Sequence, residues 1–319
     1  MGTEPTSAFH WIEVSYGAVS VCAAAIVIGV GVVRGVRRPF VAKATVALSI
    51  SIAAMCIAAG TYTIDITPST TSEGLGPEGL KFIASGTENG GLRVYSPLGS
   101  GRTTTARARS AVDQLEREGG FAKSHIVVAV PTGSGWIDAN AVEGWENKYH
   151  GDVATVAVQY SSRPSWVTFL FARSQARDSA TALIDALAAR LESVPDAERP
   201  DLHVYGQSLG SIGASEAVRD RTDICGVLWA GPPAGQVARS TRHPSVVLAN
   251  SSDPVVWWSS DLIGSEPDLT AARTDAPVPQ WIPVITYLQT TVDMLSALTT
   301  PDGHGHRYGT DQGELLPGC

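Results

Sequence analysis

The sequence predicts an α/β fold with a doubly wound, mostly parallel sheet, and two observations indicate it. First, short β-branched runs such as HIVVAV (125–130) and VATVAVQY (153–160) alternate with longer helical patterns such as RDSATALIDALAARLESV (177–194). Second, these short runs are apolar throughout instead of alternating with polar residues, which is typical of strands covered on both faces. Strands that alternate with helices in this way build a parallel sheet between two helical layers.

The rest of the sequence shows the same alternation of predicted strands and helices. LHVYG (202–206) and CGVLWAG (225–231) are expected strands, with the helical pattern SIGASEAVRD between them, and SVVLAN (245–250) is a further strand. A hydrophobic share of 44% in 319 residues is ample for a large core. The net charge of -8 provides no basic face for a phosphate backbone, so nucleic acid is not an expected partner.

Residues 1–66 are predicted to be a membrane anchor. Val14–Val33 and Ala44–Ile64 contain no charged residue, and each is long enough to span a bilayer. The loop between them is basic, so the positive-inside rule predicts a helical hairpin with both outer ends outside the cytoplasm. A cleaved signal peptide is the competing interpretation, but Glu4 and Glu13 make the leading segment acidic. We therefore expect a multi-pass protein of the cell membrane whose catalytic domain is extracytoplasmic.

The rest of the chain divides at a change in composition. Residues 67–101 are rich in Gly, Ser, Thr and Pro, which predicts an exposed connector, interrupted by a short strand near Leu92–Tyr95. Thr104–Gly119 has apolar residues at helical spacing among charges, which predicts an amphipathic surface helix. Residues 102–319 are accordingly expected to form the catalytic domain.

The strongest chemical signal is Gly206-Gln207-Ser208-Leu209-Gly210, a GxSxG motif between a predicted strand and a predicted helix. A nucleophilic serine needs such a tight strand-to-helix turn, because the flanking glycines let the backbone pass closely and leave the hydroxyl exposed. A bare GxSxG is weak evidence in a glycine-rich chain, but this context favours Ser208 as a nucleophile over a structural turn serine.

A serine nucleophile requires an acid and a histidine base later in the chain. Asp253 follows the strand SVVLAN directly, at the end of the strand where such sites gather, and is the predicted acid. Its structural alternative is a turn or helix cap before Pro254. Three further acidic residues are fallback candidates for the same role: Asp261, Glu266 and Asp268.

The predicted base lies in the glycine-rich segment 302–308, which contains two histidines. We prefer His306, with His304 as the alternative base, because Gly303–His306 resembles the histidine loop of many hydrolases. A metal site made by both histidines lacks a third ligand at an obvious spacing, so no metal and no cofactor are predicted. The other histidines are read as structural: His10, His125, His150, His203 and His243.

An acyl-transfer site also needs backbone N–H donors for the oxyanion. Leu209, the residue after the nucleophile, is expected to provide one of them. The second is expected from the loop after the strand HIVVAV, through Thr132 or Gly133. A phosphate-cradling loop is the rival interpretation, but the Gly-Lys-Ser/Thr ending is missing.

Of the four cysteines, Cys22 and Cys56 lie inside the two apolar runs and are read as small apolar side chains. Cys225 and Cys319 belong to the expected catalytic part. If that part faces an oxidising compartment, a disulfide between them is an open alternative, since spacing alone does not establish proximity.

With these residues identified, the chain from about Gly76 to Gly309 resembles an actinobacterial family of membrane-anchored alpha/beta-hydrolases. The resemblance rests on several long segments, namely GPEGLKFIASG, PTGSGWID, VAVQYSSRPSWVTFL, VYGQSLGS, LWAGPP, SSDPVVWW and PDGHGHRYG. It implies an alpha/beta-hydrolase fold and a triad of Ser208, Asp253 and one histidine of the GHGH segment. This chain has two candidate membrane spans, whereas the membrane part of the family is larger.

The sequence therefore predicts a membrane-anchored serine hydrolase that cleaves ester-type substrates, with lipids or cell-envelope esters favoured by the membrane location. The expected partners are an ester or lipid-like small molecule and the bilayer. An acyltransferase uses the same triad, and a non-catalytic binding module of the same fold is the alternative from another class. The sequence makes no prediction of the oligomeric state or of the individual substrate.

Overall fold

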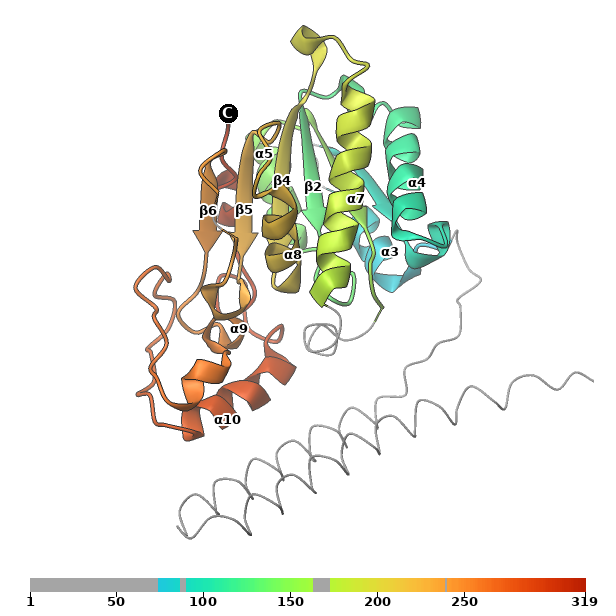
Figure 1. The fold of residues 1–319 in the computed structure, drawn as a ribbon. Coiled ribbons are helices and arrows are strands. Elements are labelled where there is room, and N and C mark those ends of the chain that lie inside the picture. Colours follow the sequence, from blue (N-terminus) through green and yellow to red (C-terminus); the bar gives the residue numbers. More distant parts are fainter. Residues whose placement is uncertain (1–73, 87–89, 163–172, 239) are drawn as a thin grey trace, which may run out of the picture. The chain divides into compact units, whose positions relative to one another are not determined.

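Six apolar runs of the sequence pair side by side as one parallel sheet, with the strand order β1-β3-β2-β4-β5-β6 (Figure 1). The strands are β1 (Leu92–Ser96), β2 (His125–Val130), β3 (Val153–Val158), β4 (Asp201–Gln207), β5 (Gly226–Ala230) and β6 (Ser245–Leu248). All the strands that the sequence predicts are present, and β4, which carries the nucleophile motif, lies between β2 and β5. The parallel α/β architecture is thus confirmed.

The computed structural model describes residues 74–86, 90–162, 173–238 and 240–319, and all of them belong to the unit Ser69–Cys319. Its α-helices are α3 (Gly76–Ala84), α4 (Thr104–Arg117), α5 (Ala139–Lys148), α7 (Arg173–Leu191), α8 (Leu209–Val218), α9 (Pro254–Trp257), α10 (Ile285–Asp293) and α11 (Asp311–Glu314). Short 3-10 turns connect several of them. None of the helices in these ranges is long and apolar enough to cross a membrane, and the two predicted spans lie outside the described residues.

Alternate side chains of β1 to β5 enter two separate cores, one on each face of the sheet. In β2, Ile126 and Val128 pack with buried residues of α4, α7 and α8, whereas Val127 and Ala129 pack with those of α3 and α5. Figure 1 shows α4, α7 and α8 along one face. Because both faces are covered, no strand position of β2 requires a polar residue, which explains its uninterrupted apolar run.

The described residues of the predicted connector 67–101 include more regular structure than was expected. The expected short strand is β1, which pairs with β3 as an edge strand of the sheet, and the helix α3 precedes it. The glycines read as signs of flexibility instead allow close packing. A Cβ added at Gly79 would lie 2.6 Å from the Tyr95 ring, and one at Gly91 would lie 2.7 Å from Glu146.

The carboxyl ends and the amino ends of the parallel strands have different features. Ser208 and Asp253 both follow the carboxyl end of a strand, where parallel sheets place their sites. At the opposite edge, Cys225 precedes β5 and forms a disulfide with Cys319, with 4.6 Å between their Cα atoms. This bond fixes the end of the chain against the start of β5, and Gly226 makes room for the backbone of Pro317 there.

Candidate active site

Ser208 lies on the tight turn between β4 and α8. Its backbone adopts the left-handed angles φ 53° and ψ -125°, which non-glycine residues rarely adopt, and its amide donates to the Ala230 carbonyl over 2.9 Å. Such strain persists only where the surrounding structure enforces it, and it gathers at functional sites. The side chain is largely buried, with 7% of the residue exposed. The serine is therefore held in the strained turn that the GxSxG pattern predicts.

Both glycines of the motif are sterically required. A Cβ on Gly206 would lie 2.7 Å from the Cα of Ser211, one turn into α8. A Cβ on Gly210 would overlap the carbonyl oxygens of Val130 and Pro131, at the end of β2. The helix can therefore begin immediately behind the serine and pack directly against the loop that follows β2.

Asp253 and His306 form a buried pair. The imidazole Nδ1 lies 2.7 Å from Asp253 Oδ2, and the two residues are 3% and 0% exposed, respectively. The same Oδ2 accepts a second hydrogen bond of 2.7 Å from the Tyr308 hydroxyl. Burial and the Asp253 charge raise the pKa of Tyr308 well above its usual value, so this hydroxyl remains a donor at neutral pH.

The other carboxylate oxygen of Asp253 has a different task. Oδ1 accepts the Val255 amide over 2.8 Å and so caps the first turn of α9. The helix cap that the sequence offers as the structural alternative is therefore present together with the contact to histidine. One buried carboxylate holds both the imidazole and the start of α9.

His304 occupies a different environment. Its Nδ1 contacts the backbone carbonyl of Asp275 over 2.9 Å, and about half of its side chain is exposed. The fallback acids Asp261, Glu266 and Asp268 are exposed and contact neither histidine in the described part of the chain. Of the predicted acids and bases, the fold thus brings together Asp253 and His306.

Ser208 and His306 both meet the carboxyl end of β5. Ser208 bonds to Ala230, and the next residue, Gly231, lies against the His306 ring: a Cβ there would be 2.7 Å from Cε1. The Gln207 side chain also reaches the His306 carbonyl over 3.4 Å. The turn that contains Ser208 and the His306 imidazole therefore both contact the backbone of Ala230 and Gly231.

The predicted oxyanion donors fall at two neighbouring places. Leu209 is the first residue of α8, where a backbone N–H has no partner within the helix and can bind an anion. The amide of Thr132 instead donates to the Trp136 carbonyl over 3.0 Å and closes its own loop. Gly133 lies in the same loop, whose first residue, Pro131, lies against Gly210 of α8. In this conformation Leu209 is thus better suited than Thr132 to stabilise an oxyanion.

The model of the alpha/beta-hydrolase family matches residues 92–243 and 236–316, which cover more than half of the chain. The chain belongs to the alpha/beta-hydrolase family. No curated protein matches the sequence. Membership makes it a hydrolase-type enzyme.

In this alpha/beta-hydrolase, two polar side chains fasten the histidine loop to the loop that contains Asp253. Asn250 donates to the Gly305 carbonyl over 2.8 Å, and Asp275 Oδ2 accepts the Gly305 amide over 2.9 Å. Asp275 Oδ1 also accepts the Ser252 amide over 2.9 Å. Burial raises the pKa of the Asp275 carboxyl group, but the hydrogen bonds from the Ser252 hydroxyl and from the Gly305 and Ser252 amides outweigh it and lower the pKa. The backbone on both sides of the Asp–His pair is therefore held by hydrogen bonds.

Sequence reasoning missed three residues of this hydrolase site: Tyr308, Gly231 and Asn250. Tyr308 stands two residues after His306, and Gly231 lies in the LWAGPP segment, so both were within motifs that had been noticed. Their roles depend on contacts between residues more than 50 positions apart, which local patterns do not contain. For Asn250, the sequence feature that could have indicated a role in the site is a polar residue at the end of an apolar strand.

We expect Gly231→Ala to destabilise the hydrolase more than Gly235→Ala. Both glycines have positive φ, 53° and 63°, but a Cβ at Gly235 meets nothing within 4 Å. Left-handed strain alone lowers the free energy of unfolding by about 1–2 kcal/mol. Overpacking against His306 should add about 1–3 kcal/mol for Gly231→Ala. Urea unfolding of the two variants measures the difference, and equal losses would show that the His306 ring moves away without strain.

Proposed function

We propose that this alpha/beta-hydrolase is a membrane-anchored serine hydrolase that cleaves ester-type substrates, with lipids or cell-envelope esters as the substrate class. The observation that carries the proposal is the buried 2.7 Å contact between Asp253 and His306, beside the strained turn of Ser208. A hydrogen-bonded carboxylate fixes the tautomer and orientation of a histidine, which then takes the proton of a serine hydroxyl.

In the proposed reaction, the Ser208 hydroxyl oxygen attacks the ester carbonyl carbon while His306 Nε2 takes the hydroxyl proton. The negative charge on the carbonyl oxygen is stabilised by the Leu209 amide and by the loop 131–136. Collapse of this intermediate breaks the ester bond, and His306 returns the proton to the departing alcohol. Water, deprotonated by His306, then attacks the acyl carbon. The bond from that carbon to Ser208 Oγ breaks, His306 returns the proton to Oγ, and the acid is released.

Tyr308 and Asp253 have supporting roles in this proposal. Asp253 remains a carboxylate throughout and stabilises the imidazolium that forms at His306. The Tyr308 hydroxyl donates to the same oxygen and so helps to hold the carboxylate in the orientation that bonds the imidazole. A buried carboxylate with too few donors would be costly, and the Val255 amide and Tyr308 hydroxyl reduce that cost.

A lipid-like substrate and a membrane location are supported by the segment between Asp253 and His306. Exposed apolar side chains gather in its second half, and four of them have about half of their surface in solvent: Val278, Ile282, Ile285 and Val292. Apolar groups exposed together mark surfaces that contact a membrane, a protein or a ligand, and a membrane is the contact that fits this proposal. The Cys225–Cys319 disulfide supports an extracytoplasmic location, because such bonds persist in oxidising compartments.

The test is covalent labelling of the full-length, detergent-solubilised protein with a fluorophosphonate probe, followed by mass spectrometry of the labelled peptides. We expect one label per chain, on Ser208, because only a serine activated by a base reacts with such a probe. Heat-denatured protein is the control, since it retains every hydroxyl but not the site. Absence of a label under conditions that label a known serine hydrolase, or a label on another residue, would refute the proposal.

A further inference from the structure

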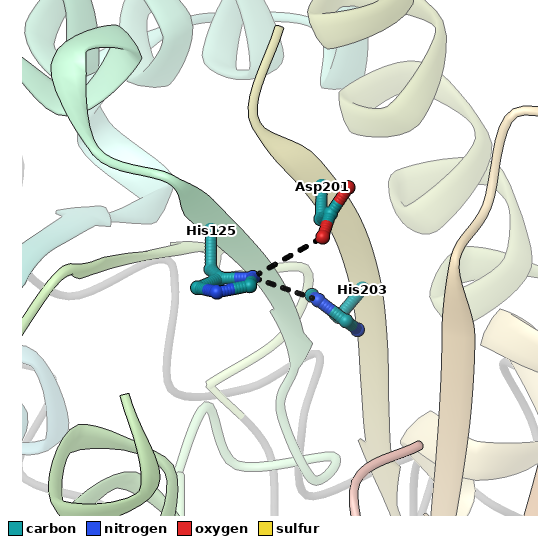
Figure 2. A group of neighbouring side chains, drawn as sticks. All are labelled: His125, Asp201 and His203. Atoms are coloured by element: carbon teal, nitrogen blue, oxygen red, sulfur yellow. Dashed lines mark hydrogen bonds and ion pairs between the residues drawn. The ribbon is translucent and has the colours of Figure 1, made fainter. Parts of the chain in front are cut away.

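Three side chains with metal-ligating atoms gather at the amino-terminal edge of the sheet, the edge opposite Ser208 (Figure 2). His125 begins β2 and Asp201 begins β4, and the two are register partners across the parallel pair. His203 lies two residues after Asp201 and so on the same face of β4. A strand of this length separates the group from the catalytic edge by about 20 Å.

The spacing of the three atoms fits a shared cation. His125 Nδ1 lies 3.4 Å from His203 Nε2 and 3.6 Å from Asp201 Oδ2, and all three atoms lie within 4.8 Å of one another. Zinc binds nitrogen and oxygen at about 2.0–2.2 Å in a tetrahedron, so neighbouring ligand atoms stand about 3.3–3.5 Å apart. Both measured contacts are longer than an ordinary hydrogen bond and close to this edge length.

Hydrogen bonds among the described residues leave the Nε2 atom of His203 without a close partner. The residue is fully buried, a backbone hydrogen bond with Pro317 acts on its ring, and its Nε2 has the long 3.4 Å contact with His125. Burying a polar ring without good hydrogen bonds is unfavourable. A metal ion bound at Nε2 would give this buried imidazole a closer partner than the 3.4 Å contact does.

We propose that His125, Asp201 and His203 form a metal site for a divalent transition ion, and that zinc is the ion that this ligand set fits best. Two imidazoles and one carboxylate with a fourth position for water are a usual zinc environment. The proposal does not depend on the function of Ser208. It gives a role to two histidines that the sequence analysis treats as structural.

The surroundings of the metal site hold its ligands and leave it open to solvent. The Tyr149 ring stacks on His125 at 3.8 Å between centroids and fixes the plane of that imidazole. The side chains of Asp201 and His125 are 46% and 23% exposed, so an ion can enter from solvent.

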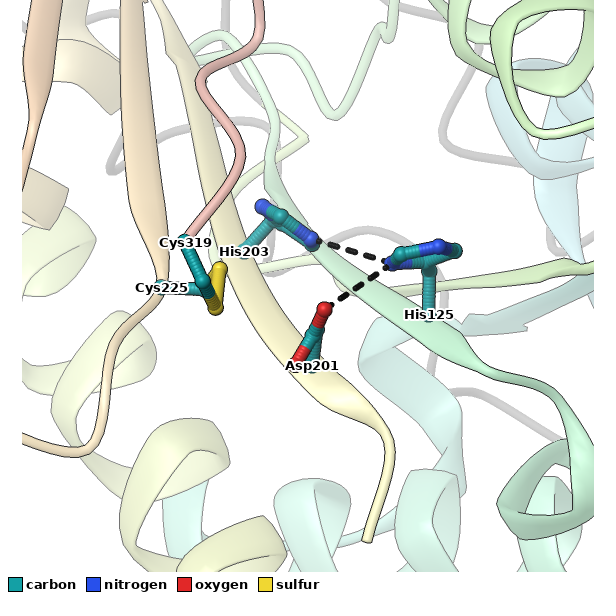
Figure 3. Close-up of a disulfide and its surroundings, with 5 residues drawn as sticks. All are labelled: His125, Asp201, His203, Cys225 and Cys319. Atoms are coloured by element: carbon teal, nitrogen blue, oxygen red, sulfur yellow. Dashed lines mark hydrogen bonds and ion pairs between the residues drawn. A yellow bond between two sulfur atoms is a disulfide. The ribbon is translucent and has the colours of Figure 1, made fainter.

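The Cys225–Cys319 disulfide lies beside the metal site (Figure 3), with its sulfur atoms within 4.8 Å of a carboxylate oxygen of Asp201. In the disulfide these sulfurs are not thiolates, and the thiolate is the form that binds metal ions. The ligand set therefore consists of the two histidines and Asp201. A bound ion would join the starts of β2 and β4, the strands that lead to the two loops beside Ser208.

The test is calorimetric titration of Zn²⁺ into the full-length, chelator-treated protein, with wild type compared against His125→Gln, Asp201→Asn and His150→Gln. His150 is exposed in the loop that leads to β3, at the same edge of the sheet, and is the matched control. We expect one ion per chain in wild type and in His150→Gln. Loss of a ligand should weaken binding about 100-fold or more, since even partners that only support a ligand change affinity 10–100-fold.

Two further readouts keep the test decisive. Co²⁺ bound in a tetrahedral site absorbs strongly in the visible range, and this band should be present in wild type and absent from His125→Gln. Circular dichroism of the metal-free variants checks that they are folded. No saturable binding to wild type, or equal affinity in His125→Gln and His150→Gln, would overturn the proposal.

Discussion

His306→Ala is expected to lower kcat/KM for ester hydrolysis by about 10⁴- to 10⁶-fold, because loss of the base in a serine hydrolase removes nearly all activation of the nucleophile. The structure places the His306 imidazole on Asp253 and against Gly231, beside the Ser208 turn. Without it, the serine hydroxyl has no group to take its proton. Hydrolysis of p-nitrophenyl esters of increasing acyl length measures the loss and also tests the preference for lipid-like chains.

His304→Ala is the matched control for this experiment. The residue is in the same loop, two positions away, but its ring is half exposed and contacts the Asp275 carbonyl. We expect its kcat/KM to stay within about threefold of wild type, as is usual for a surface substitution that leaves the site intact. A large loss in His304→Ala with retained activity in His306→Ala would reverse the assignment of the base. Urea unfolding of both variants separates this outcome from misfolding.

Removing the Cys225–Cys319 disulfide is expected to lower the free energy of unfolding by about 4–5 kcal/mol, the amount that chain entropy predicts for a closed loop of this size. The bond joins residues 94 positions apart, so the unfolded chain gains considerable freedom when it is absent. This is a large fraction of the stability of an ordinary domain. Urea unfolding of Cys225→Ala and Cys319→Ala, compared with wild type, measures the loss.

The two cysteine variants control for each other. Cys225 is 8% exposed and Cys319 is exposed, so packing losses should affect the first much more than the second. Similar losses in both variants would show that the covalent bond is responsible. Reductant should destabilise wild type and leave both variants unchanged. A loss confined to Cys225→Ala would assign the effect to packing instead.

Much of the architecture could be predicted because the strands are covered on both faces and are therefore apolar without interruption. HIVVAV became β2 and VATVAV became β3 for this reason. In the segment 76–101 the sequence indicated the strand β1 but not the helix α3, because the glycines around it resemble a linker. The reason for a glycine at position 79 is the ring of Tyr95, which the local sequence does not reveal.

Some residues of the candidate site could also be predicted from the sequence, whereas the choice of the histidine needed the folded structure. Ser208 and Asp253 could be named because each stands just after a strand, where the order of the chain and the direction of the strands place reactive groups. The choice between His304 and His306 rested on a slight resemblance, because both lie in the same flexible-looking loop. Their difference arises from the folded environment: Asn250 and Asp275 hold the Gly305 backbone so that the two rings meet different partners.

The carboxylate of Asp253 joins the start of α9 to the imidazole of His306. Its two oxygens lie in one rigid plane, so a rotation that improves the cap of α9 also changes the bond to the imidazole. The helix α9 opens the segment that leads to the exposed apolar side chains of α10. If a lipid surface displaced that segment, the movement of α9 would reorient the Asp253 carboxylate and with it the His306 imidazole. Contact with a lipid surface would then change the catalytic rate without a separate regulatory element.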